Sequence, residues 1–212
     1  MKNIGILLIV TVLLGTSCTD YLTEDNRSTI TTDEYYSTEA GYEALVNACY
    51  STLRELYSDM NFDNDNQKNY TSMQGLSMLG TDLFCSGHLA DQNDILDGYY
   101  LLTPDHSAVE LLFTNCYKSI QLHNVALSWA NKTVQTEKIP ARVAEVRFIR
   151  ADVYYILLEF YGGVSIIEEA FDMPVESFPR DSEEDVYAFI IKELTEIRNA
   201  LPETPEQVGR VS

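Results

Sequence analysis

The chain has 212 residues, enough for one domain with a substantial hydrophobic core. It carries 33 Asp and Glu against 14 Lys and Arg, which gives a formal net charge of −19 at neutral pH. So acidic a chain repels phosphate backbones and anionic lipid surfaces. This excludes nucleic-acid binding and leaves covalent or hydrophobic attachment as the routes to a membrane.

The first 17 residues have the pattern of a bacterial export signal. Lys2 supplies a basic start, and Ile4 to Leu14 form an apolar run that is too short to span a bilayer. Small residues then precede Cys18 directly, as in a lipobox, although glycine replaces the usual leucine three places before the cysteine. We predict that residues 1–17 are a lipoprotein signal peptide and that Cys18 is lipidated. The alternative is an ordinary secretory peptide that leaves Cys18 as a spare thiol.

A polar tether and a first helix follow the export signal. Residues 18–32 lack periodicity, as expected of a tether between a lipid anchor and a folded domain of residues 33–212. A helix is predicted to begin after Ser37 and Thr38, whose hydroxyls can cap it, and to reach about Tyr57. Its apolar positions recur at helical spacing: Tyr42, Leu45, Val46, Cys49, Leu53 and Leu56.

Residues 58–106 break the helical pattern and form a long insertion. They are rich in Asp, Asn and Gly, and the segment best suited to a short helix is Met73 to Leu83. An irregular stretch of this length is functional or disordered, and its aromatic residues argue against simple disorder. Asp63 and Asp65 resemble the start of a calcium loop that lacks the required glycine and closing glutamate, so we predict no metal site there.

The next two helices are predicted to form an antiparallel pair of tetratricopeptide size, Ser107–Lys132 and Ala141–Tyr161. The second helix is apolar around much of its circumference and should be stopped by Gly162-Gly163. Asn124 lies on the apolar stripe of the first. A bond from Asn124 to neighbouring backbone is the commoner use of a buried asparagine, and a ligand contact is the rarer one.

A last helix is predicted after an extended link of residues 166–179. Asp181 and Ser182 should cap its start, where three acidic residues follow and favour the positive end of the helix. Pro202 and Pro205 should end it. Its apolar stripe is Val186, Phe189, Ile190, Leu194, Ile197 and Leu201.

No motif for catalysis or cofactor binding occurs in the chain. Phosphate loops, nucleophile elbows, dinucleotide fingerprints and paired metal-binding cysteines are absent from the sequence, so we predict no cofactor and no enzyme. Paired carboxylates of a glycoside hydrolase stay possible among so many acids. The odd set of Cys49, Cys85 and Cys116 argues against a disulfide framework, and Cys49 and Cys116 fall on apolar helix faces as buried thiols.

Several motifs along the helices carry a family resemblance. Residues 144–151 read Ala-Glu-Val-Arg-Phe-Ile-Arg-Ala, and a Tyr-rich helix ending in Tyr-Gly-Gly-Val follows them. Phe113, Tyr117, Ile120 and Asn124 form a second motif at helical spacing. These features resemble the SusD/RagB family of outer-membrane nutrient-binding lipoproteins, with Ser165 standing where the family usually has proline. The resemblance covers only the N-terminal part of a family member, so we expect a truncated gene or a fragment.

The resemblance implies an all-α fold of stacked, tetratricopeptide-like helical hairpins, in which residues 58–106 are a loop insertion. It implies a non-catalytic, surface-exposed lipoprotein that binds oligosaccharides and acts with a SusC-like TonB-dependent transporter. Because flat aromatic faces can cover the C–H face of a pyranose, the candidate ligand contacts are Tyr70, Phe84, Tyr99 and Tyr100. The alternative role of these rings is to pin the loop to the helices. A surface glycoside hydrolase and a helical-repeat scaffold are the alternative functions.

Overall fold

The computed structural model describes residues 31–57, 73–78, 81–83, 103–173, 175 and 177–212. In these segments every regular element is an α-helix, which confirms the all-α fold class. No helix of the described segments combines the length and the apolarity needed to cross a membrane. The chain divides into two units, Met1–Glu34 and Tyr35–Ser212, and the helical body described below is the second.

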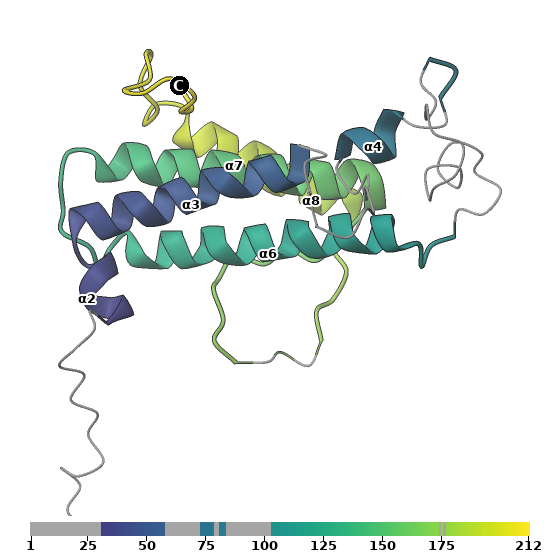
Figure 1. The fold of residues 1–212 in the computed structure, drawn as a ribbon, viewed down its shortest axis with the longest axis horizontal. Helices are drawn as coiled ribbons and strands as arrows, with labels where there is room; N and C mark the ends of the chain where they lie inside the picture. Colours follow the sequence, from purple (N-terminus) through teal and green to yellow (C-terminus); the bar gives the residue numbers. More distant parts are fainter. Residues whose placement is uncertain (1–30, 58–72, 79–80, 84–102, 174, 176) are drawn as a thin grey trace, which may run out of the picture. The chain divides into compact units, whose positions relative to one another are not determined.

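In the described segments four long helices form the body, and α7 lies at its centre. The helices are α2 Thr32–Tyr36, α3 Glu39–Tyr57, α4 Met73–Met78, α6 Ser107–Trp129, α7 Ile139–Tyr161 and α8 Glu183–Ile197. α7 contacts α3, α6 and α8, and Figure 1 shows α3, α6 and α7 running side by side. The long helices start close to the predicted positions. At the start of α3, the Thr38 hydroxyl accepts a hydrogen bond from the N–H of Gly41 at 3.0 Å, as expected of a cap.

α7 is buried around most of its circumference because helices cover it on several sides. Ile149, Tyr154 and Leu157 have no exposed surface. One apolar cluster joins α7 to α6 and α8, and a second joins it to α3 and α6. Cys49 and Cys116 are buried in these clusters as free thiols, as predicted. Burial raises the pKa of each thiol to about 12, so both stay protonated and pack as small apolar groups.

The connection between α7 and α8 is a loop whose two ends are held together. Gly162 ends α7 with a φ of 71°, a left-handed conformation that favours glycine. Gly163 lies so close to the far end of the loop that a Cβ there would be 2.3 Å from the carbonyl oxygen of Asp181. The Asp181 carboxylate in turn accepts a hydrogen bond from the N–H of Ile166 at 2.7 Å. Residues 164–180 form the link loop. Its first and last residues therefore lie near each other at the same end of α7.

α8 differs from its prediction in two positions. Leu194 was expected in the buried stripe but is 37% exposed, and Leu201 lies beyond the end of the helix at Ile197. The buried residue in this stretch is Glu193, at 2% exposure. Burial alone would raise the pKa of Glu193, but hydrogen bonds from two arginines of α7, Arg147 and Arg150, hold that pKa below its usual value. The Glu193 carboxylate, paired with two arginines, thus lies on the buried face of α8, where the periodicity of the sequence predicts apolar side chains.

Candidate functional site

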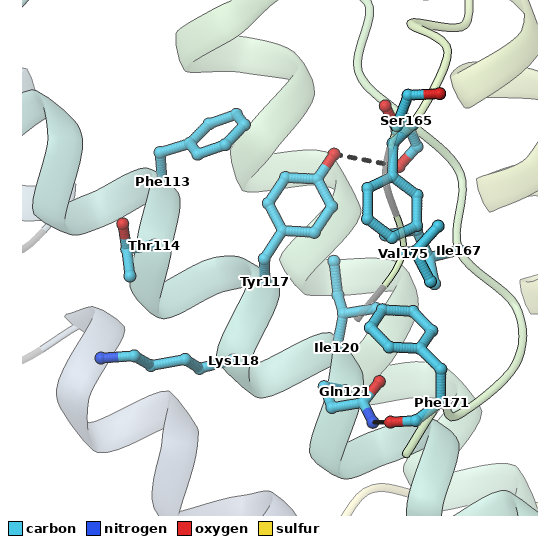
Figure 2. Close-up of a pocket in the computed structure, with 12 residues that line it drawn as sticks. Phe113, Thr114, Tyr117, Lys118, Ile120, Gln121, Ser165, Ile167, Phe171 and Val175 are labelled. Atoms are coloured by element: carbon cyan, nitrogen blue, oxygen red, sulfur yellow. Dashed lines mark hydrogen bonds between the residues drawn. The ribbon is translucent and has the colours of Figure 1, made fainter. Parts of the chain in front are cut away.

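A groove lies between one face of α6 and the link loop. It has a volume of about 800 Å³, which is in the range of small-molecule binding sites. Six residues of α6 between Phe113 and Gln121 line it on one side, and six residues of the link loop between Ser165 and Phe178 line it on the other. Figure 2 shows these side chains converging from the helix and from the loop.

Side chains of α6 and α7 hold the link loop in place by bonding to its backbone. Three side chains of α6, about one turn apart, each donate to a carbonyl of the loop: Tyr117 to Ser165 at 3.0 Å, Gln121 to Phe171 at 2.9 Å and Asn124 to Ile167 at 2.9 Å. From α7, the Tyr154 hydroxyl accepts a hydrogen bond from the N–H of Ile167 at 2.7 Å. Burial raises the pKa of the Tyr117 hydroxyl, which keeps it protonated as a donor.

A buried arginine fixes the orientation of one of these side chains. Arg150 donates to Oδ1 of Asn124 at 2.7 Å and to the Glu193 carboxylate at 2.6 Å. The amide nitrogen of Asn124 is thereby directed to the loop carbonyls of Ile167 and Glu169. Asn124 thus makes the backbone bonds expected of a buried asparagine, and it has a structural role in shaping the groove wall.

Aromatic rings line both sides of the groove. On α6, the rings of Phe113 and Tyr117 lie 4.8 Å apart between centroids, and Tyr161 of α7 packs edge-on against Phe113 at 5.2 Å. On the link loop, the rings of Phe171 and Phe178 lie 5.4 Å apart. Phe113, Phe171 and Phe178 keep 39%, 36% and 43% of their surface exposed. Rings this accessible offer apolar faces to a ligand instead of filling the core.

The polar groups of the groove can donate and accept hydrogen bonds. They are the hydroxyls of serine, threonine and tyrosine, the Gln121 amide and the Lys118 ammonium. The nitrogen of the Gln121 amide bonds to the loop, whereas its oxygen is buried and has no hydrogen-bond partner in the described structure. A buried acceptor left unpaired is costly, so Oε1 of Gln121 is a point where a ligand or water would gain a bond. The described lining includes no carboxylate.

The groove is not predicted from the sequence, because residues 166–179 show no periodicity that would place their side chains. Phe113 belongs to the motif at helical spacing in α6, and it stays partly exposed at the groove. The available signal is a pair of aromatic residues one turn apart, Phe113 and Tyr117, together with Phe171 and Phe178 in a segment that contains two prolines. Such a pattern identifies the aromatic residues, but it does not predict that they line the same groove.

The residues predicted from the sequence to contact a ligand lie outside the described segments. They are Tyr70, Phe84, Tyr99 and Tyr100, and the predicted lipidation site, Cys18, also falls outside. Three further residues also lie outside the described segments: Asp63 and Asp65 of the calcium-like motif, and Cys85. These interpretations remain predictions from the sequence.

Comparisons with known proteins show which proteins this chain is similar to. Residues 20–211 match a model of a SusD-like family that is described as starch-binding and associating with the outer membrane. The SusD-like protein P2 of Formosa agariphila is 26% identical over 208 residues, which are 96% of this chain and 39% of that protein. A SusD superfamily protein from Parabacteroides distasonis has the same fold, with a TM-score of 0.65 at 20% identity over 87% of this chain and 37% of that one.

A second similar structure is a laminarin-binding SusD-like protein, with a TM-score of 0.64 at 21% identity over 84% of this chain and 38% of that chain. The present chain therefore spans less than two fifths of the length of the relatives that it matches. The family model covers nearly all of the chain, as the motifs of α6 and α7 led us to expect. This chain belongs to the SusD-like family.

Proposed function

We propose that this chain is the glycan-capturing N-terminal part of a lipid-anchored protein of the outer membrane, which faces the cell exterior. In this role it would hold oligosaccharides and deliver them to a SusC-like TonB-dependent transporter. The observation that carries the proposal is the match of residues 20–211 to a family described as starch-binding and associating with the outer membrane. A similar fold in a laminarin-binding protein supports the same class of ligand.

Membrane attachment in this proposal depends on the N-terminal sequence. The apolar run before Cys18 and the small residues next to it fit a lipoprotein signal, after whose removal Cys18 would carry the lipid. Acyl chains anchor a protein through about 0.8 kcal/mol per buried methylene, so several chains hold it firmly. Residues 18–32 would then be the tether that separates the lipid from the helices.

Ligand contacts are proposed for aromatic residues of the insertion 58–106. Tyr70, Phe84, Tyr99 and Tyr100 offer flat faces for sugar C–H groups, and the tyrosines add a hydroxyl that can bond to the sugar. A loop that carries recognition residues on a rigid helical body is a common arrangement, because the body positions the loop and the loop is free to vary.

The test is binding of neutral and acidic oligosaccharides to the purified chain on a glycan array, followed by calorimetry. Replacing Tyr99 or Tyr100 by alanine should weaken binding by about tenfold or more, the equivalent of roughly 1.4 kcal/mol. Tyr155 is a matched control, because it is a tyrosine 48% exposed on α7, and Tyr155→Ala should bind as the parent does.

A turnover assay and a co-purification assay with the same chain separate the alternative functions. Sustained turnover of a bound oligosaccharide by the purified chain would establish a glycoside hydrolase instead of a binding protein. If no glycan binds while a TonB-dependent transporter still co-purifies with the chain, a helical-repeat scaffold is the correct function. Equal binding by the parent and both tyrosine variants would leave glycan capture in place and remove Tyr99 and Tyr100 from the site.

A further inference from the structure

The groove between α6 and the link loop is a built site that the loop residues of the proposed function do not explain. We infer that it binds a neutral pyranose chain, which stacks against the Phe113–Tyr117 pair on α6 and the Phe171–Phe178 pair on the link loop. The inference rests on the proposed function and adds to it a second binding site and a class of glycan.

The first argument is the arrangement of rings. Two aromatic pairs, from segments about 60 residues apart in the sequence, line one cavity of about 800 Å³. A pyranose has a flat face of C–H groups and an edge of hydroxyls, so it can bury the face on a ring and keep the edge in contact with polar groups. An aliphatic ligand could bury its surface equally well against aliphatic side chains, so it would not require the flat faces of aromatic rings.

The second argument is an unpaired acceptor in the wall of the groove. Oε1 of Gln121 is buried and unpaired in the described structure, while the nitrogen of the same amide is tied to the carbonyl of Phe171 at 2.9 Å. That bond fixes the orientation of the amide, and Figure 2 shows its oxygen on the side of the Phe171 ring. A sugar hydroxyl is a donor of the right kind to satisfy this oxygen.

The third argument is charge, which selects neutral over acidic sugars. The described lining of the groove has no carboxylate, yet three exposed carboxylates lie along the link loop next to the lining residues: Glu168, Glu169 and Asp172. The chain as a whole has a net charge of −19. A uronate or a sulfated sugar would meet repulsion from this field, and Lys118 is the single cation of the described lining to offset it.

The experiment measures the dissociation constants of maltoheptaose, laminarihexaose and a galacturonate oligomer for the full chain. Phe178→Ala and Phe171→Ala should weaken binding of at least one neutral probe by about tenfold, the equivalent of roughly 1.4 kcal/mol. Both side chains are partly exposed, so the variants should keep the circular dichroism and the melting temperature of the parent. Met173→Ala is the matched control, since Met173 lies on the same loop, is 74% exposed and does not line the groove.

A tryptophan at the groove gives a direct readout of occupancy. Trp129 is the single tryptophan of the chain, so Phe178→Trp adds one indole whose fluorescence reports the groove. The neutral probe should change the emission of this variant with the affinity found by calorimetry, and should leave the emission of the parent unchanged.

Three outcomes would overturn the inference. If the loop variants Tyr99→Ala and Tyr100→Ala lose binding while Phe171→Ala and Phe178→Ala bind as the parent does, the groove is no glycan site and the proposed function stands. If the galacturonate oligomer binds more tightly than the neutral probes, the class of glycan is wrong. If none of the probes binds the parent, the groove inference fails, and the glycan array decides separately whether the chain captures another oligosaccharide.

Discussion

Buried charged side chains of α7 pair with one another and with side chains of other segments. Glu145 is 1% exposed and accepts hydrogen bonds from Arg142 at 2.7 Å and from Arg210 at 2.6 Å. Arg150, at 4% exposure, bonds to Asn124 and to Glu193. Removing one member of such a group leaves a buried charge without its partner, which is far more costly than losing an exposed ion pair. The charged residues of the family-like motif are therefore explained by the folding of the helical body.

His123 is a fully buried residue of α6 whose ring has no such partner. Its ring has no exposed surface, and neither nitrogen makes a hydrogen bond within the described structure. Burial lowers the pKa of His123 from 6.5 to about 4, and the charge of Arg150 acts in the same direction. The Cys49 backbone lies near enough to oppose this shift, although it does not meet hydrogen-bond geometry.

We predict that His123 makes the fold sensitive to acid between pH 6.5 and pH 4. In this window the unfolded chain takes up a proton at His123 and the folded chain does not, so the free energy of unfolding falls as the pH falls. The contribution is fully present above pH 6.5, and its loss by pH 4 amounts to about 3 kcal/mol. Urea denaturation at several pH values gives the free energy of unfolding of the parent and of His123→Leu. The contribution of His123 is the difference between the two chains in how steeply this free energy changes with pH.

Comparing the two chains cancels the carboxylates that titrate in the same range. His123→Leu can change the absolute stability through packing, but that change is independent of pH. If the free energy of unfolding of His123→Leu falls with acid as steeply as that of the parent, the neutral buried histidine is not the cause.

Among the secondary-structure elements, α8 depends on its start and on one face. Ser182 accepts a hydrogen bond at its hydroxyl from the N–H of Asp185 at 3.1 Å, and the Asp185 carboxylate accepts one from the N–H of Ser182 at 3.4 Å. This capping box satisfies two donors of the first turn. Val186 and Phe189 then bury their side chains against α7 and α6, whereas Ile191 remains 62% exposed. α8 is thus held to the body through one side and through its start.

We predict that Ser182→Ala lowers the free energy of unfolding by about 1 kcal/mol, because the first turn of α8 loses its cap. The melting temperature should fall by about 3 °C for a chain of this size. Thr195→Ala is the matched control, since Thr195 is exposed within the same helix, and alanine there slightly favours the helix. Equal melting temperatures of Ser182→Ala and the parent would mean that the capping box adds nothing to stability.

The elements with periodic sequence are predicted well, and the segments without it are not. Apolar spacing places α3, α6, α7 and α8, and glycine or serine places the end of α7 and the start of α8. The buried Glu193 escapes prediction because its partners, Arg147 and Arg150, lie more than 40 residues away in the sequence. The groove is not predicted for a similar reason, since the path of the link loop is set by hydrogen bonds to side chains of α6 and α7.

In the whole molecule, residues far apart in the chain are joined by one arginine. Arg210 donates to Glu145 of α7 at 2.6 Å and to Glu43 and Asn47 of α3, each at 2.9 Å. Its guanidinium also lies 5.6 Å from the centre of the Tyr50 ring, and the N–H of Val211 donates to the Tyr50 hydroxyl at 3.0 Å. The segment after α8 is thereby fastened to the first long helix and to the central helix at once.

We predict that Arg210→Met lowers the free energy of unfolding by about 3 kcal/mol, because the side chain is 8% exposed and its loss leaves the Glu145 carboxylate buried with one fewer partner. Arg142 still pairs with Glu145, so the variant should fold and can be measured by urea denaturation. Arg198→Met is the matched control, since Arg198 is exposed at the end of α8. Limited proteolysis should also cut the segment after α8 faster in Arg210→Met than in Arg198→Met. If both variants unfold at the same urea concentration, the bonds of Arg210 add nothing to the stability of the fold, and the segment after α8 is held by its other contacts, such as the ion pair between Glu206 and Arg142.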